Sequence, residues 1–408
     1  MLGGYPAGLA VARALAPQGV QVICVWHERA EVGRRSRHVD RCVESPDPVR
    51  AEGEYVRLLE EIADQTAGGV LMPTSDEAVG AVARHRDGLA DAFRVACVGW
   101  PVAERCLDKA RTYALADELG VATPATLEIG SLAELEAARE RIVFPSVVKP
   151  RRSHLYYRRF RSKMALVDDF DALLAAWRDA DSAGLEMLVQ EFVPGDDTHG
   201  VNYNAYVVDG VAVAETTAQK LRLTPPRTGF PCAIVSREIP EIIEPARRLL
   251  AGMGYEGFAN VEFKRDERDG VYKLMEVNGR PNYSNLLSLR VGVNFPWIAY
   301  SHLVYGSVPE RPPRQRNGVF WIALPADAIR AGRGQRPRLA ELTRPYRGPH
   351  VFELWDARDP WPFATGIATG TRLRLGRLGA RVRRSASSLA RGRRAADPIP
   401  AKGSDLGG

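Results

Sequence analysis

Apolar and polar positions follow two alternating periods over the first hundred residues of the chain. Residues 6–16 and 52–65 carry apolar side chains three and four positions apart, which predicts two amphipathic helices. Residues 20–25 and 93–98 are almost continuously apolar, as is typical of parallel strands that are covered on both faces. Because helices and strands alternate, we predict a doubly wound α/β domain over residues 1–104.

The first strand of this domain is missing from the pattern. Gly3, Gly4 and Gly8 form a turn that opens a helix, and such a turn ordinarily follows a strand. Here it begins directly after Met1. Either the reading frame starts further upstream, or the domain has lost this strand. We favour the first explanation, and expect that an upstream extension supplies an apolar strand and raises stability.

The length and charge of the chain change this picture in two ways. At 408 residues the chain has room for two or three domains. Its net charge of +6 is misleading, because residues 371–396 hold nine arginines and no acid, and without them the charge is −3. We expect residues 371–408 to be a disordered tail. Attachment of this tail to an anionic membrane surface is the alternative, and we expect no nucleic-acid binding by the body.

The cysteines and the apolar runs bear on the compartment. The five cysteines are scattered without metal-type spacing, as is typical of reduced thiols in a cytoplasmic protein. No run of 18 apolar residues appears, and the start of the chain has no signal-peptide pattern. We therefore expect a cytoplasmic protein.

Two carboxylates end two strand-like runs. Glu262 lies near the end of residues 257–263, and Glu276 follows residues 271–275, fourteen positions later. Asn278 is two residues beyond Glu276, so both project from the same face of a strand. Oxygen ligands on neighbouring strands are what Mg²⁺ needs when it bridges nucleotide phosphates. Solvated acids on an edge strand are the alternative interpretation.

Two lysines are placed to reach phosphate groups. Lys149 ends a buried strand-like run, where its ammonium group can act as a compact point charge. Lys109 begins a helix, a position that is unfavourable for a cation unless an anion lies nearby. A strand-end lysine in water is the alternative for Lys149.

A strand that runs into a Pro-Gly turn follows at residues 189–195. Such a hinge offers backbone N–H and C=O groups to the edge of an adenine ring, while apolar neighbours enclose the ring. Glu191 and Phe192 are the expected contacts, with Val193 next to them and Gln190 before them.

In this order and spacing, the motifs resemble the ATP-grasp superfamily of carboxylate–amine ligases. Within it the chain looks most like the ATP-dependent carboligases that include D-aspartate ligase. The resemblance implies an ATP-grasp domain at 105–310 with a lid subdomain at about 145–193, a C-terminal extension at 311–370, and an overall α/β and α+β fold. Residues 151–161 depart from the family's small, glycine-rich phosphate loop. The segments that carry the resemblance are Lys109, 147–150, 190–195, 220–229, 257–266, 275–280 and 352–360.

The resemblance also implies a reaction. A carboxylate attacks the γ-phosphate of ATP, and an amine then displaces phosphate from the acyl phosphate to form an amide. Arg280 would stabilise the acyl phosphate, and Mg²⁺, with Mn²⁺ as an alternative, would accompany ATP. The other implied roles are phosphate contacts at Lys109 and Lys149, adenine contacts at Gln190, Glu191, Phe192 and Val193, metal ligands at Glu262, Glu276 and Asn278, and γ-phosphate or carboxylate contacts at Lys220, Arg222 and Arg227.

Two other functions stay open. One is a kinase-like phosphotransferase that uses the same site, and its products would distinguish it from a ligase. The other is a non-catalytic nucleotide-binding module, against which the full set of metal and phosphate residues argues. We expect small-molecule acid and amine substrates, and a homodimer is an alternative to a monomer. His154 and His199 are expected to be solvated loop residues.

Overall fold

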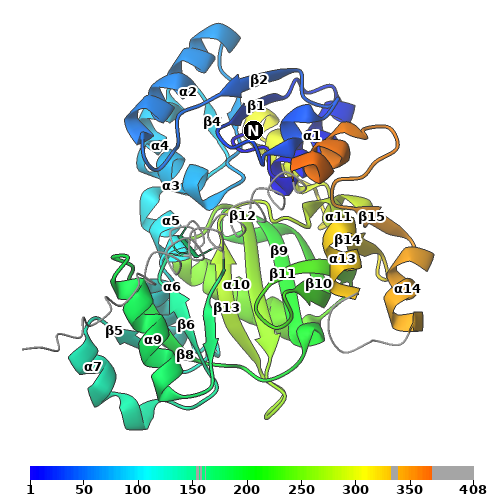
Figure 1. The fold of residues 1–408 in the computed structure, drawn as a ribbon. Helices are drawn as coiled ribbons and strands as arrows, with labels where there is room; N and C mark the ends of the chain where they lie inside the picture. Colours follow the sequence, from blue (N-terminus) through cyan, green and yellow to red (C-terminus); the bar gives the residue numbers. More distant parts are fainter. Residues whose placement is uncertain (153–155, 157–158, 161, 332–338, 370–408) are drawn as a thin grey trace, which may run out of the picture.

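A computed structural model shows the fold of the chain. It consists of an N-terminal domain, a small sheet and a large central sheet (Figure 1). The predicted tail at 371–408 and His154 lie outside the described residues. No helix in the described part of the chain is long and apolar enough to cross a bilayer. The structure describes residues 1–152, 156, 159–160, 162–331 and 339–369.

The N-terminal domain alternates helices and short parallel strands, as predicted. Helix α1 begins at Pro6, where the missing N–H of proline leaves no hydrogen bond unmade. Strands β1 and β2 are parallel, and so are β3 and β4. The elements are α1 (Pro6–Leu15), β1 (Ile23–Trp26), β2 (Arg41–Glu44), α2 (Glu52–Thr66), β3 (Val70–Leu71), α3 (Asp76–Arg84), α4 (Arg86–Ala90) and β4 (Arg94–Val95).

A single residue stands where the first strand was expected. Leu2 forms parallel bridges with Val25 on one side and Pro73 on the other. The Leu2 N–H donates to the Met72 carbonyl at 2.9 Å, and the Val25 N–H donates to the Met1 carbonyl at 3.1 Å. The two strand pairs are therefore joined through the first two residues of the sequence.

The glycine turn after Leu2 is closed by a protein carboxylate. The Gly4 N–H donates to Glu31 Oε2 at 2.5 Å, and the Glu31 side chain is fully buried. A Cβ on Gly8 would lie 2.0 Å from the Gly3 carbonyl oxygen, so only glycine allows the helix to pack this closely. Close packing in this turn therefore explains why Gly4 and Gly8 stand at their positions.

A four-stranded antiparallel sheet forms the small subdomain, in the order β5-β8-β6-β7. Helix α9 packs on it and is capped by Asp169, which accepts from the Ala172 N–H at 2.8 Å. Because β5 belongs to this sheet, the subdomain extends beyond the predicted 145–193. The elements are α5 (Trp100–Leu107), α6 (Lys109–Glu118), β5 (Thr126–Ile129), α7 (Leu132–Ala137), β6 (Ser146–Pro150), β7 (Ala165–Val167), α9 (Phe170–Asp181) and β8 (Met187–Glu191).

The central sheet has seven strands in the order β13-β12-β9-β10-β11-β14-β15. Only its last pair, β14 and β15, is parallel. Strand β10 is long, because it pairs with β9 from Val211 to Gln219 and with β11 from Ala218 to Thr224. The strands are β9 (Gly200–Val208), β10 (Val211–Thr224), β11 (Phe230–Ser236), β12 (Gly257–Arg265), β13 (Tyr272–Asn278), β14 (Phe320–Ile322) and β15 (His350–Phe352).

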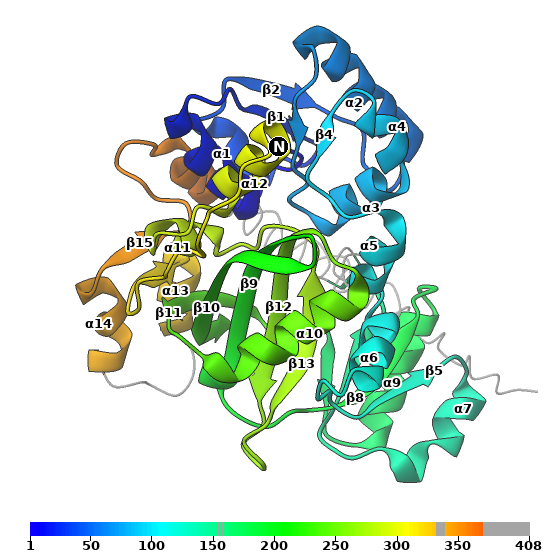
Figure 2. The ribbon, with the colours of Figure 1, turned by 180° about the vertical axis from the view of Figure 1, so that it is seen from behind.

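Helix α10 crosses one face of this sheet (Figure 2). Val261 and Phe263 of β12 are buried in one core cluster with Leu249 of α10. Since side chains alternate along a strand, Glu262 points to the opposite face. The helices around the sheet are α10 (Ile243–Met253), α11 (Asn285–Arg290), α12 (Phe295–Tyr305), α13 (Leu324–Ala331) and α14 (Leu339–Arg347).

The C-terminal extension returns to the N-terminal domain, where it lies beside α1 (Figure 1). Asp359 is fully buried and forms a 3.0 Å ion pair with Arg13 of α1. The same carboxylate accepts from Ser36 Oγ at 2.6 Å and from the Arg37 N–H at 2.9 Å. This contact ties the two ends of the described chain together.

Candidate active site

Two carboxylates lie at the centre of a cleft between the central sheet, the small sheet and the N-terminal domain. Glu262 of β12 and Glu276 of β13 are direct partners in the antiparallel register. Directly opposite side chains project from the same face, so the two carboxylates are neighbours. Both carboxylates line the two parts of the cleft. We call these parts the lysine-rich half and the acidic half, after the charged side chains that line each of them.

Lysines surround the carboxylate pair. Lys109 Nζ lies 2.7 Å from Glu276 Oε1, and Lys220 Nζ lies 2.5 Å from Glu262 Oε2. Lys149 Nζ donates to the Met275 carbonyl at 2.9 Å, immediately beside Glu276. The basic side chains that line the lysine-rich half are Lys109, Lys149, Lys163, Lys220, Arg227 and Lys264, and its acidic ones are Asp196, Asp197, Glu262 and Glu276.

This arrangement keeps the carboxylates ionised. Burial works to raise the pKa of Glu276, but the charges of Lys109, Lys163 and Lys149 outweigh it and lower the pKa. The pKa of Glu262 is lowered in the same way, against burial, by Lys220 and Lys163. Burial lowers the pKa of Lys149 to about 8. With basic groups in excess, the lysine-rich half fits a polyanion such as a nucleotide triphosphate.

Asn278 completes an oxygen donor set with the two carboxylates. Its Nδ2 donates to Asn260 Oδ1 at 3.0 Å, which turns its Oδ1 toward Arg280 Nη2 at 3.2 Å. Within the described residues there is no group of three or more His, Cys, Asp or Glu that would hold a metal alone. Two carboxylates and an amide oxygen therefore suit Mg²⁺ that is carried by nucleotide phosphates.

Arg280 is held by the N-terminal domain. Its Nε donates to Asp76 Oδ1 at 2.6 Å. The cap of α3 is Ser75, which accepts from the Ala78 N–H at 3.2 Å. Asp76 is thereby left to face the cleft, where it fixes the arginine beside Asn278.

Arg222 is a predicted residue that the structure pairs outside the cleft. Its Nε and Nη2 donate to the two oxygens of Asp327, at 2.6 and 2.7 Å. Tyr346 donates to the same carboxylate at 2.6 Å. Arg222 lies beyond the bulge that follows Lys220, and it joins the sheet to α13.

The predicted adenine segment lies at the end of β8, beside the lysine-rich half. Glu191 accepts from Lys273 Nζ at 2.7 Å and from Arg268 Nη2 at 2.9 Å. Lys264 Nζ lies 4.4 Å from the centre of the Phe192 ring. Gln190 Oε1 is buried without a hydrogen-bond partner in the described chain, and Val193 is buried. None of the residues 190–193 is among the described lining residues of that half.

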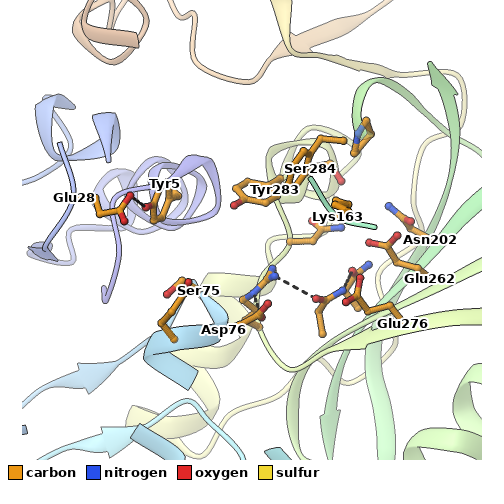
Figure 3. Close-up of a pocket in the computed structure, with 17 residues that line it drawn as sticks. Tyr5, Glu28, Ser75, Asp76, Lys163, Asn202, Glu262, Glu276, Tyr283 and Ser284 are labelled. Atoms are coloured by element: carbon orange, nitrogen blue, oxygen red, sulfur yellow. Dashed lines mark hydrogen bonds and ion pairs between the residues drawn. The ribbon is translucent and has the colours of Figure 1, made fainter. Parts of the chain in front are cut away.

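The acidic half has a volume of about 200 Å³ and lies between the N-terminal domain and the central sheet. Figure 3 shows Tyr5 and Glu28 on one side of it and Glu262 and Glu276 on the other. Among the described residues, its acidic lining residues are Glu28, Asp76, Glu77, Glu262 and Glu276, whereas its basic ones are Lys163 and Arg280. Counted over the described lining residues, the two halves of the cleft therefore have opposite charge.

Sequence reasoning missed several of these residues. Lys163 lines both halves, with its Nζ 4.2 Å from the centre of the Phe230 ring. It follows an arginine-rich segment, so no local pattern distinguished it from its neighbours. Asn202 and Asn260 lie in register with Glu262 and Asn278, and pairing β12 with β9 and β13 would have located them.

Comparison with known families agrees with this architecture. A family model described as "ATP-grasp in the biosynthetic pathway with Ter operon" matches residues 211–322. The chain is 28% identical to a D-aspartate ligase of Enterococcus faecium over 260 residues, which is 61% of this chain and 62% of that protein. It is 26% identical to a D-alanine–D-alanine ligase of Ectopseudomonas mendocina over 193 residues, 44% of this chain and 57% of that protein. The matches span less than two thirds of these curated relatives.

Solved structures share the fold. An L-amino acid ligase from Bacillus licheniformis superimposes with a TM-score of 0.59 at 18% identity, covering 77% of this chain and 74% of the other. An N5-carboxyaminoimidazole ribonucleotide synthetase from Thermus thermophilus gives a TM-score of 0.58 at 18% identity, covering 77% and 80%. The predicted fold class and the resemblance to the D-aspartate ligase group are thereby confirmed.

Proposed function

Starting from the ATP-grasp fold of this chain, we propose that the protein is an ATP-dependent carboxylate–amine ligase that forms an amide through an acyl phosphate. The observation that carries this proposal is the in-register pair of Glu262 and Glu276 within a cluster of lysines. Such a cluster suits the transfer of a phosphoryl group, in which catalysis consists mostly of positioning and charge neutralisation.

The first step takes place in the lysine-rich half. A substrate carboxylate oxygen attacks the γ-phosphorus of ATP, and the bond between that phosphorus and the bridging oxygen breaks to release ADP. Lys109, Lys149 and Lys220 hold the phosphate oxygens, whose charge shifts during transfer. Each of the three lines this half. Phosphate oxygens would replace the carboxylates that Lys109 and Lys220 now contact and the carbonyl to which Lys149 donates.

The second step takes place where the two halves meet. The amine nitrogen attacks the acyl carbon, the bond from this carbon to the phosphate oxygen breaks, and the amine proton leaves with the phosphate as HPO₄²⁻. Arg280 is held beside Asn278 by Asp76, so its guanidinium can stabilise the oxygens that gain charge. Of the three residues predicted to contact the γ-phosphate or the carboxylate, Lys220 and Arg227 line the lysine-rich half and keep that role, whereas Arg222 pairs with Asp327.

Mg²⁺ fits the donor set formed by Glu262, Glu276 and Asn278, and Mn²⁺ is the alternative. When bound, the ion neutralises charge on the transferring phosphoryl oxygens. We also propose that adenine lies against the end of β8, near residues 190–193, and that the reaction takes place in the cytoplasm, where ATP is available.

The substrates are proposed to be small amino or carboxylic acids, because the relatives are named as D-aspartate and D-alanine ligases. ATP-dependent phosphate release, measured on pairs from a panel of carboxylates and amines, tests this proposal. Mass spectrometry of the products should show ADP, phosphate and an amide. ADP together with a stable phosphorylated compound would instead show a kinase, and no turnover with any pair would refute the ligase.

A further inference from the structure

The acidic half of the cleft contains carboxylates that the ligase reaction leaves unused. Glu28 follows β1, and Glu77 lies in the first turn of α3. Both are partly exposed and line the cavity of about 200 Å³. Glu28 accepts from the Tyr5 hydroxyl at 2.7 Å. Across the described ranges, no basic side chain forms an ion pair with Glu28 or Glu77, whereas Asp76, which lines the same cavity, pairs with Arg280.

A buried amide side chain lines the same cavity from the central sheet. Asn202 is 3% exposed and lies directly opposite Glu262 in the pairing of β9 with β12. Its Oδ1 has no hydrogen-bond donor in the described chain, although Asn202 is one of the lining residues. The neighbouring Asn204 Oδ1, in contrast, accepts from Asn260 at 2.9 Å and from Asn282 at 2.7 Å. An unpaired oxygen at this position favours a ligand that donates an N–H.

We propose that the acidic half binds a dibasic amine, for example a diamino acid or a diamine, as the second substrate of the ligase. Glu28 and Glu77 hold the amino group that stays positively charged. The reacting nitrogen donates an N–H to Asn202 Oδ1 beside Glu262, next to the lysine-rich half. This inference rests on the proposed function, because the second nitrogen is the one that attacks the acyl phosphate.

The walls of the cavity agree with such a ligand. Phe230 and Tyr283 pack edge to face with their ring centres 6.2 Å apart, and both line the cavity with Tyr5. Aromatic rings provide an apolar surface for the methylene chain between two amino groups. An acidic substrate, in contrast, would face Glu28 and Glu77 while Arg280 is already paired with Asp76.

Binding to the full-length protein without ATP tests the site independently of turnover. Calorimetric titration should compare ornithine with norvaline, lysine with norleucine, and putrescine with butylamine. The members of each pair share a carbon chain and differ in one amino group. We expect at least one dibasic ligand to bind about tenfold more tightly than the counterpart that lacks one amino group. Equal affinities within every pair would overturn the inference.

Isosteric variants locate the effect. Glu28→Gln and Glu77→Gln should each remove the preference, which is a loss of about tenfold in affinity for the dibasic ligand. Glu60→Gln, on the exposed side of α2, is the matched control and should keep it. If both cavity variants bind like Glu60→Gln, the carboxylates do not hold the ligand and the inference is wrong.

Turnover separates this inference from the proposed function. Asn202→Leu should raise the KM for the amine, leave the KM for ATP unchanged and keep a wild-type melting temperature. If Glu77→Gln leaves the KM for every amine unchanged while amides still form, the ligase stands and the dibasic substrate is refuted. If no pair of substrates releases phosphate while the binding preference persists and is lost in Glu77→Gln, the site stands and the ligase is refuted.

Discussion

Replacing Glu276 with glutamine is the sharpest test of the proposed metal site. The substitution keeps the shape of the side chain and its register opposite Glu262, and removes one negative charge. Glu276 lies 2.7 Å from Lys109, and the charges of Lys163 and Lys149 also lower its pKa. The variant therefore removes one of two carboxylates from a cluster in which basic groups are already in excess.

The expected loss of activity can be estimated from this geometry. Metal-assisted charge stabilisation contributes several kcal/mol to phosphoryl transfer, and we take about 3–5 kcal/mol as the part that needs Glu276. At about 1.4 kcal/mol per tenfold change in rate, kcat should fall by about 10²- to 10⁴-fold. Removing one partner of a buried ion pair costs about 3–5 kcal/mol of stability. Because the Glu276 side chain is 23% exposed, we expect a smaller cost of about 2 kcal/mol, and a folded protein.

Two measurements test the expected change in metal binding and the expected change in stability. Calorimetric titration with ATP, with and without Mg²⁺, reports the metal site without knowledge of the substrates, and thermal unfolding reports the fold. Glu215→Gln is the matched control, because Glu215 lies in the same sheet, forms a 2.6 Å ion pair with Arg247, and does not line the cleft. The control should lose stability but keep the effect of Mg²⁺ on ATP affinity.

The result that refutes the metal assignment is specific. If Glu276→Gln binds ATP with the same Mg²⁺ dependence as the wild type, Glu276 does not bind the ion. Turnover within about threefold of the wild type would lead to the same conclusion, since the loss expected above is at least about 10²-fold. An unfolded variant is identified by its melting curve, and the same titration with Glu262→Gln then replaces it.

Three further predictions concern other parts of the molecule. Burial lowers the pKa of Lys149 to about 8, and only the protonated form pairs with phosphate, so kcat/KM for ATP should fall as the pH rises past about 8. Lys149→Arg should remove that fall, and Lys149→Ala should raise KM and lower kcat. A flat pH profile of kcat/KM for the wild type would contradict the assignment of Lys149 as a phosphate contact. Asp359→Asn should lower the free energy of unfolding by about 3–5 kcal/mol in denaturant titrations, because it leaves the buried guanidinium of Arg13 without its counter-ion; an unchanged midpoint would show that the clamp contributes nothing. Truncation after residue 370 should leave turnover unchanged. If the arginine-rich tail is a membrane tether, the truncation should also abolish a salt-sensitive binding to anionic vesicles. Equal vesicle binding by the full-length and the truncated protein, or by neither, rules out the tether.

The pair of carboxylates was predictable because its signal is local. Glu262 and Glu276 each end a strand-like run, and a carboxylate at that position is visible without any knowledge of the fold. Their direct opposition was not predictable, since the residues between the two strands allow more than one register and the irregularity after Glu262 shifts it. The sequence therefore indicated the chemistry of the pair, and tertiary packing set its geometry.

Arg222 shows where the same reasoning fails. A basic residue two positions after Lys220 would share its face in a regular strand, so a common role in the cleft was reasonable. The register shift between Lys220 and Arg222 changes that direction, and Asp327 accepts from the arginine 105 positions later in the chain. Neither a bulge nor such a distant partner leaves a mark in the local pattern of residues.

The acidic half was invisible to the sequence for a related reason. Tyr5, Glu28, Glu77 and Asn202 come from four separate segments, and each is an ordinary polar residue in its own surroundings. Their charges become informative only when they are compared with the charges of the lysine-rich half, and this arrangement exists only in the folded chain. A ligase that binds a nucleotide triphosphate gains little from a uniformly basic cleft if its second substrate is a cation. Separating the two charges across Glu262 and Glu276 lets each substrate enter a field of opposite sign, and brings the reacting groups together where the halves meet.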